Sequence, residues 1–306
     1  MSAGGGGKAI AAALGANLAI AVAKLVGFAV TGSSSMLAES VHSLADSGNQ
    51  VLLLVGGKRA QRDADERHPF GYGRERYFYS FVVALVLFSV GSLFALYEGV
   101  HKVQHPEELD TPSVAIGILV FALLAEGFSF RTAISEAAPL KGDLGWGHYI
   151  RRAKSPELPV VLLEDFAALI GLALALLGVV LALVTDDPVW DGVGTLAIGA
   201  LLAIVAIVLA IEMKGLLIGE AASREAVDAI RAALVDGSTV LRVIHLKTLH
   251  LGPDELLVAA KIAVAPGLAL PAVARAIDDA EVRVRAVEPL ARQMYLEPDL
   301  DRGGTP

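Results

Sequence analysis

The sequence predicts an all-α membrane domain of six transmembrane helices followed by a small α+β domain. Of the 306 residues, 55% are hydrophobic and only 19% are charged, whereas about 25% are charged in a typical soluble protein. The mean hydropathy is +0.60. Apolar segments long enough to cross a bilayer, which takes about 20 residues, fill the region 1–220, and shorter alternating patterns follow it.

Six apolar segments have the required length. They are Ala9–Val30, Met36–Gly56, Tyr77–Val100, Ser113–Ile134, Val160–Val184 and Gly192–Ile218. The first is too long for the apolar core of a secretory signal peptide, and another span follows it at once. The second contains polar residues that lower its hydropathy without shortening it. We therefore expect residues 1–220 to form a six-span domain.

Basic residues are concentrated in two of the loops between these segments. They are Lys58, Arg59, Arg62, Arg67, Arg74 and Arg76 after the second segment, and Lys141, Arg151, Arg152 and Lys154 after the fourth. The loop after the third segment has only Lys102, and the loop after the fifth has none. Because basic loops stay in the cytoplasm, we expect both termini there and the protein in the cell (plasma) membrane.

Residues 221–298 are expected to form a cytoplasmic domain of the ferredoxin-like type. Ser223 should cap a helix over SREAVDAIRAAL. The further expected elements are strands Val240–His250 and Leu256–Ala265, helix Pro271–Asp279, and a last strand at either Val282–Val287 or Gln293–Leu296. Such a sheet needs helices over one face. Residues 299–306 are expected to be disordered.

Composition also excludes several classes of site and partner. The chain has no cysteine, so disulfides and thiolate metal sites are excluded. Its net charge of −8 argues against nucleic-acid binding. No H-E-x-x-H motif is present, and we expect neither an enzyme nor a bound cofactor.

Four polar residues share one face of the second apolar segment. Glu39, His42, Asp46 and Asn49 are spaced 3, 4 and 3 apart, which places them on one side of a helix. Each ionisable group at depth in a bilayer costs at least ~2.5 kcal/mol, so such groups persist mainly at functional sites. His42 and Asp46, at i and i+4, can reach one metal ion. The alternative is a hydrogen bond between helices.

The fifth segment supplies two adjacent carboxylates, Glu164 and Asp165. Neighbours on a helix point about 100° apart, so only one of them faces an ion well, and we choose Asp165 as the ligand. Glu164 is then a supporting base, a cavity-lining group or a residue near the headgroups. Alternatively, both carboxylates stabilise the start of a helix, as Pro159 just upstream also suggests.

Three further polar residues interrupt apolar segments. Asn17 and Glu126 are expected to line a cavity or to form packing hydrogen bonds rather than to bind metal. Lys24 is placed near the outer end of the first segment, where its long side chain would reach the headgroups.

The motifs SSSMLAESVHSLADSGNQ, HPFGYGRERY and VVLLED occur in this order, with PVWDG opening the sixth segment and MYLEPD near the end. In combination they resemble the cation diffusion facilitator family of divalent-metal transporters, most closely the branch typified by zinc transporter nine. The resemblance covers nearly the whole chain. It implies six spans and a C-terminal domain that forms a homodimer.

The resemblance also implies a transport site made of two i, i+4 pairs. The first pair matches His42 and Asp46. The second matches only Asp165, because Val161 occupies the usual His or Asp position, so Glu164, Glu39, Asn49 or water would complete the shell. A second family metal site in the loop after span two is reduced here to Asp65 and His68, because Tyr72 replaces its last histidine.

One histidine with two carboxylates suits Zn²⁺, while Mn²⁺ or Fe²⁺ would tolerate the same ligands. Metal and protons compete for these groups, so we expect proton-coupled export of Zn²⁺ by alternating access. A manganese or iron exporter is the alternative. A metal-sensing receptor and an intramembrane zinc hydrolase are weaker hypotheses, and the hydrolase would need a third strong ligand, a general base and a substrate cleft. A liposome flux assay separates both from a transporter, since neither would move ions across a membrane.

Overall fold

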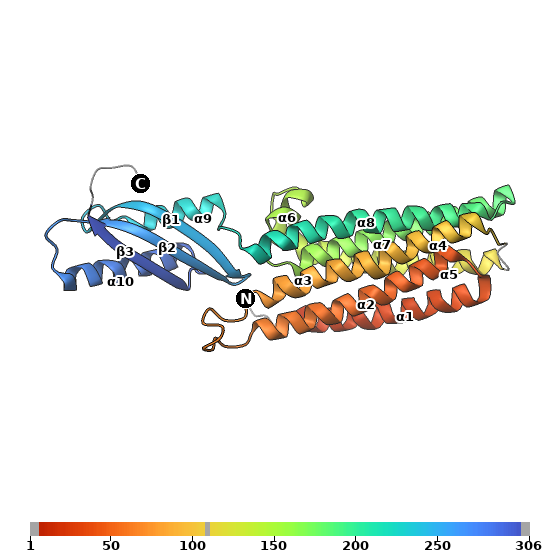
Figure 1. The fold of residues 1–306 in the computed structure, drawn as a ribbon, viewed down its shortest axis with the longest axis horizontal. Helices are drawn as coiled ribbons and strands as arrows, with labels where there is room; N and C mark the ends of the chain where they lie inside the picture. The colour runs from red at the N-terminus through yellow and green to blue at the C-terminus, as the bar shows by residue number, and fades with distance from the viewer. Residues whose placement is uncertain (1–5, 108–110, 301–306) are drawn as a thin grey trace. The chain divides into compact units, whose positions relative to one another are not determined.

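The structure, a computed structural model, describes residues 6–107 and 111–300 and divides into two compact units (Figure 1). Within these ranges, the first unit contains the residues up to Arg59 and Arg76–Lys214. The second contains Ala60–Glu75 and the residues from Gly215 onward. The loop after the second helix therefore packs with the C-terminal part of the chain, which its position in the sequence does not reveal.

The first unit is a bundle of long helices (Figure 1). Its elements are α1 (Gly6–Thr31), α2 (Ser34–Ala60), α3 (Glu75–Val86), the π-helical segment η1 (Leu87–Ser92), α4 (Leu93–Gln104), α5 (Pro112–Lys141), α6 (Trp146–Arg152), α7 (Glu157–Thr185) and α8 (Val189–Ile218). Four helical stretches in the described part are long and apolar enough to cross a membrane: Glu75–Gln104, Pro112–Lys141, Glu157–Thr185 and Val189–Ile218. A helical membrane domain is thus confirmed, and the count of six stays a prediction.

The bundle carries apolar side chains on its outside and ionisable ones inside. Leu124, Phe128 and Val184 are at least 70% exposed, whereas Asp46 and Asp165 are 6% exposed. Large exposed apolar surfaces mark contact with another apolar phase, and here the phase that fits is lipid. Helix α2 is not among the four apolar helices, because the polar residues on its buried face lower its mean hydropathy.

The C-terminal unit is a three-stranded sheet with two helices. Its elements are α9 (Arg224–Leu234), β1 (Val240–Gly252), β2 (Glu255–Val264), α10 (Leu270–Val287) and β3 (Gln293–Leu300). The strand order is β1-β2-β3, with β1 antiparallel and β3 parallel to β2. Ile230 of α9 and Val284 of α10 share one buried core with alternate β2 residues such as Val258. This small α/β domain is confirmed; its ferredoxin-like classification stays a prediction.

Two expectations for this domain can now be settled. Ser223 caps α9 as predicted, since its hydroxyl accepts a hydrogen bond of 3.1 Å from the N–H of Ala226. The alternative last strand at Val282–Val287 is wrong, because α10 continues through it. Ala276, Ala280 and Val284 recur every four residues and are all buried, so the helical period extends further than we had expected. The last strand is β3.

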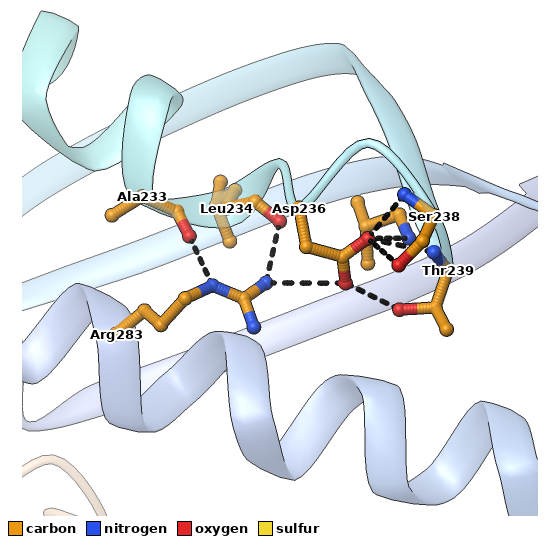
Figure 2. Close-up of polar contacts among 7 residues, drawn as sticks. Ala233, Leu234, Asp236, Ser238, Thr239 and Arg283 are labelled. Carbon is orange, nitrogen blue, oxygen red and sulfur yellow. Dashed lines mark hydrogen bonds and ion pairs between the residues drawn. The ribbon is translucent and has the colours of Figure 1, made fainter.

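Arg283 and Asp236 tie α10 to the end of α9 (Figure 2). The Arg283 guanidinium donates hydrogen bonds of 2.8 and 3.1 Å to the carbonyls of Ala233 and Leu234. It also lies 3.7 Å from the Asp236 carboxylate. These contacts satisfy carbonyls at a helix end that have no partner within the helix, and they fix the turn that leads into β1.

Asp236 organises this turn as a multiple acceptor. One carboxylate oxygen accepts hydrogen bonds of 2.7, 2.6 and 3.1 Å from the N–H groups of Ser238, Thr239 and Val240. The other accepts the Thr239 hydroxyl. Partial desolvation would raise the pKa of Asp236, but these hydrogen bonds outweigh it and hold the pKa below its usual range. The resulting stabilisation is present above the unfolded pKa of about 3.9 and is lost as the pH falls toward the folded value.

Asp236→Ala is therefore expected to destabilise the C-terminal domain by about 1–2 kcal/mol, since it removes a cap-like acceptor from several N–H groups. Hydrogen exchange of the amides at the start of β1 measures the effect and should become faster. Asp278→Ala is the control, because Asp278 is exposed on α10. Equal exchange in the two variants would contradict the role given to Asp236.

Candidate metal centre

The predicted polar face of α2 is buried inside the bundle. Glu39, His42, Asp46 and Asn49 are all 6% exposed or less. The His42 Nε2 atom lies 3.5 Å from Asp46 Oδ2. Neither ring nitrogen of His42, nor Asp46 Oδ1, has a hydrogen-bond partner among the described residues. A buried imidazole and carboxylate left in this way cost free energy unless something else binds them.

The two carboxylates of α7 are also buried, and each contacts a different helix. Glu164 Oε1 accepts a hydrogen bond of 2.7 Å from Asn49 Nδ2 on α2. Asp165 Oδ2 accepts one of 3.2 Å from the Ser129 hydroxyl on α5. Because α7 begins at Glu157, both residues lie in its third turn. The interpretation that they stabilise the first turn of a helix is therefore wrong.

Helices α2, α5 and α7 bring their acidic groups together. Asp46 interacts electrostatically with Glu164, Glu126 and Asp165, and Asp165 interacts with Glu126. Repulsion among so many carboxylates favours a bound cation. Nevertheless, no three His, Asp or Glu side chains in the described part of the chain form a ready metal-binding group. The predicted ligands therefore lie in one region of the bundle, but no three of these described residues are close enough together to hold one metal ion.

Lys24 differs from the expectation made for it, and it pairs with Glu39. Lys24 does not reach the headgroups: its side chain is fully buried, and its Nζ lies 3.1 Å from Glu39 Oε2. The lysine also donates a hydrogen bond of 2.7 Å to the Ser43 hydroxyl. Glu39 is likewise fully buried. Asn17, on the same helix as Lys24, is buried as well.

Sequence reasoning missed the π-helical segment η1 beside the site. A Cβ atom at Gly91 would lie 3.9 Å from His42 Nδ1. The Ser92 hydroxyl donates a hydrogen bond of 2.9 Å to the carbonyl of Gly199 on α8. Wide helical turns of this kind often occur at functional sites. The small residues Ser89, Gly91 and Ser92 within an apolar span are the signal that could have indicated it.

The loop residues Asp65 and His68, predicted as a weak second metal site, form a compact turn. Asp65 Oδ1 accepts hydrogen bonds from the N–H groups of Arg67 and His68, and Oδ2 accepts 2.6 Å from the Tyr72 hydroxyl. His68 Nδ1 lies 3.3 Å from the same carboxylate. The Tyr72 hydroxyl, followed by the N–H groups, lowers the pKa of Asp65. Tyr72, which stands where the resemblance implies the last histidine of a metal site, thus pairs with Asp65.

Residues 10–218 match the family described as the cation efflux transmembrane domain. The mitochondrial proton-coupled zinc antiporter SLC30A9 of Xenopus laevis is 32% identical over 84% of this chain and 46% of its own length. Metal tolerance protein C4 of Arabidopsis thaliana is 31% identical over 83% and 56%. Magnetosome protein MamB of a Magnetospira strain is 25% identical over 74% and 72%. The chain spans about half the length of the first two relatives.

The predicted location in the cell (plasma) membrane is contradicted by these relatives. Those from Xenopus laevis, Mus musculus and Homo sapiens are all named as mitochondrial. Apolar helices predict insertion into a bilayer, and basic loops predict its orientation, but neither feature specifies which membrane receives the protein. An integral membrane protein remains supported.

Proposed function

The chain belongs to the cation diffusion facilitator family, in the branch of zinc transporter nine, and we propose that it transports Zn²⁺ across a membrane in exchange for protons. The observation that carries this proposal is the buried pair His42 and Asp46. Its ring nitrogens and one carboxylate oxygen have no hydrogen-bond partner among the described residues, and acidic groups of α5 and α7 surround it. Imidazole nitrogen and carboxylate oxygen are donors that suit a dication.

His42, Asp46 and Asp165 are the proposed direct ligands. Imidazole nitrogen with carboxylate oxygen suits tetrahedral Zn²⁺, with a fourth group completing the shell. Asn49 offers a buried Oδ1 atom without a hydrogen-bond partner among the residues described, and Glu164 is held beside it. Glu39 is the weakest candidate, because Lys24 already pairs with it. The same ligands would accept Mn²⁺ or Fe²⁺ with more water.

Proton exchange follows from the chemistry of these ligands. Metal binding requires a neutral imidazole and ionised carboxylates, so each bound metal displaces protons, and protons displace the metal. If the site opens to one side of the membrane at a time, a proton gradient drives metal in the opposite direction. This is alternating access with one shared binding region.

The remaining architecture is proposed on the same basis. Helices α1 and α2 contain 26 and 27 residues, which is about 40 Å at 1.5 Å per residue and enough to cross a bilayer. Together with the four apolar helices they would give six spans. The C-terminal unit is proposed to be ferredoxin-like and to form the contact of a homodimer.

A flux assay tests the transport proposal. The full chain is reconstituted into liposomes that contain a zinc-sensitive dye, with a pH difference across the membrane. We expect zinc flux that rises with the pH difference and moves protons the opposite way. Competition with Mn²⁺ and Fe²⁺ then orders the metals. If zinc binds but no ion moves, the protein is a receptor and the proposal is wrong.

A further inference from the structure

The fully buried ion pair between Lys24 of α1 and Glu39 of α2 lies outside the three direct ligands proposed above. Both side chains are 0% exposed, with Nζ and Oε2 3.1 Å apart. The ammonium also binds the Ser43 hydroxyl, next in sequence to His42. Ionisable groups are costly inside a membrane and usually mark a function there. A pair that served only to hold two helices together could be replaced by apolar residues at little loss.

The ion pair lies within the electrostatic field of the metal centre. Lys24 interacts electrostatically with His42, with Asp46 and with Glu126 on α5. On α7, a Cβ atom at Gly171 would come within 2.6 Å of Glu39 Oε1. Oε1, the carboxylate oxygen that Lys24 does not contact, therefore points toward the helix that carries Asp165, and it has no hydrogen-bond partner in the described part of the chain.

We propose that the Lys24 ammonium belongs to the metal centre, where it neutralises Glu39 and so weakens the hold of the site on the transported dication. This inference rests on the proposed function. The carboxylates of the region are Glu39, Asp46, Glu126, Glu164 and Asp165. Lys24 is the cation that interacts with Asp46 and Glu126 among them. Without it, a dication would be bound too tightly for rapid release.

The expected size of the effect follows from the charges. Glu39 and Asp46 are two helical turns apart, about 10 Å along α2. In a protein interior of intermediate dielectric constant, a unit charge at that distance changes the affinity for a dication by about tenfold or more. Lys24 therefore acts through charge on a metal that it does not touch, as a positioning and specificity residue.

Opposite shifts of the zinc Kd in two variants distinguish this role from a purely structural one, in which the ion pair only holds α1 against α2. Lys24→Met should lower the zinc Kd about tenfold and reduce kcat for flux, because the metal leaves more slowly. Glu39→Gln should raise the zinc Kd about tenfold, because the ammonium then repels the metal without compensation. The double variant restores neutrality and should return to within about threefold of the unaltered protein. Isothermal titration calorimetry on the full chain in nanodiscs measures each Kd.

Two further variants serve as controls. Lys24→Arg keeps the charge and should keep the zinc Kd. Lys102→Met removes another buried lysine, on α4, whose Nζ lies 3.6 Å from Glu107 Oε2. This variant should leave the zinc Kd unchanged. If the two single variants fail to fold, the double variant and Lys24→Arg carry the test, and loss of zinc affinity in either overturns the inference.

The inference is also overturned if both single variants shift the Kd in the same direction, or if neither shifts it by more than about twofold. Those results are expected if the ion pair only holds α1 against α2. Failure of the proposed function looks different, because the unaltered chain itself would then bind or move no zinc. If the unaltered chain transports zinc normally but both single variants shift the zinc Kd in the same direction, the role proposed for Lys24 is wrong and the transport function still stands.

Discussion

Replacing His42 by alanine is expected to reduce proton-driven zinc flux by about 100-fold or more. The imidazole is the one nitrogen donor among the proposed ligands, and its two ring nitrogens have no other partner in the residues described. Loss of a direct ligand should exceed the about 10–100-fold effects of groups that only support ligands. Asp46→Ala should act similarly. The liposome flux assay measures both variants.

The control for this pair is His148→Ala, which makes the same change at an exposed position of α6. It should transport zinc at the rate of the unaltered protein. If zinc flux survives in both His42→Ala and Asp46→Ala, the metal centre is wrongly placed on α2, and the buried pair has only a structural role.

Asp165→Asn should reduce zinc flux nearly as far, because it removes a charged ligand while keeping the shape of the side chain. Its amide can still contact the Ser129 hydroxyl that now binds Asp165, so packing between α5 and α7 is largely preserved. Glu164→Gln should have a smaller effect, about tenfold or less. The glutamine oxygen can still accept the hydrogen bond from Asn49 that Glu164 accepts at 2.7 Å.

Measurement of flux against zinc concentration separates the two carboxylates. A ligand should alter KM strongly, whereas a residue that holds Asn49 in place should alter it little. If Glu164→Gln is the more damaging change, then the ligand on α7 is Glu164, and the assignment made here must be exchanged. Unchanged flux in both variants would remove α7 from the site altogether.

The sequence predicted the parts of this protein that follow from periodicity. The spacing of Glu39, His42, Asp46 and Asn49 indicated one buried face of α2, and the structure confirms that burial. Ser223 was found as a cap because its hydroxyl acts on a residue only three positions away. Helix α10 was predicted too short, since its last two turns are rich in valine, which also favours strands.

The contacts that the sequence could not predict join residues far apart in the chain. Lys24 resembles a lysine that extends toward water until its partner 15 residues away is known. Asn49 and Glu164 are 115 residues apart, and nothing local indicates that they meet. The η1 segment contacts α8 through a hydrogen bond from the Ser92 hydroxyl to the carbonyl of Gly199, 107 residues further along the chain.

Residues 60–75, which join α2 to α3, belong with the C-terminal sheet. The chain leaves α2 at Ala60 and enters α3 at Glu75, and everything between belongs to the C-terminal unit. Gly73 and Gly252 meet so closely there that a Cβ atom on Gly73 would lie 3.1 Å from the Cα atom of Gly252. The helix that carries His42 is therefore joined through Ala60 directly to a segment that folds with the C-terminal sheet.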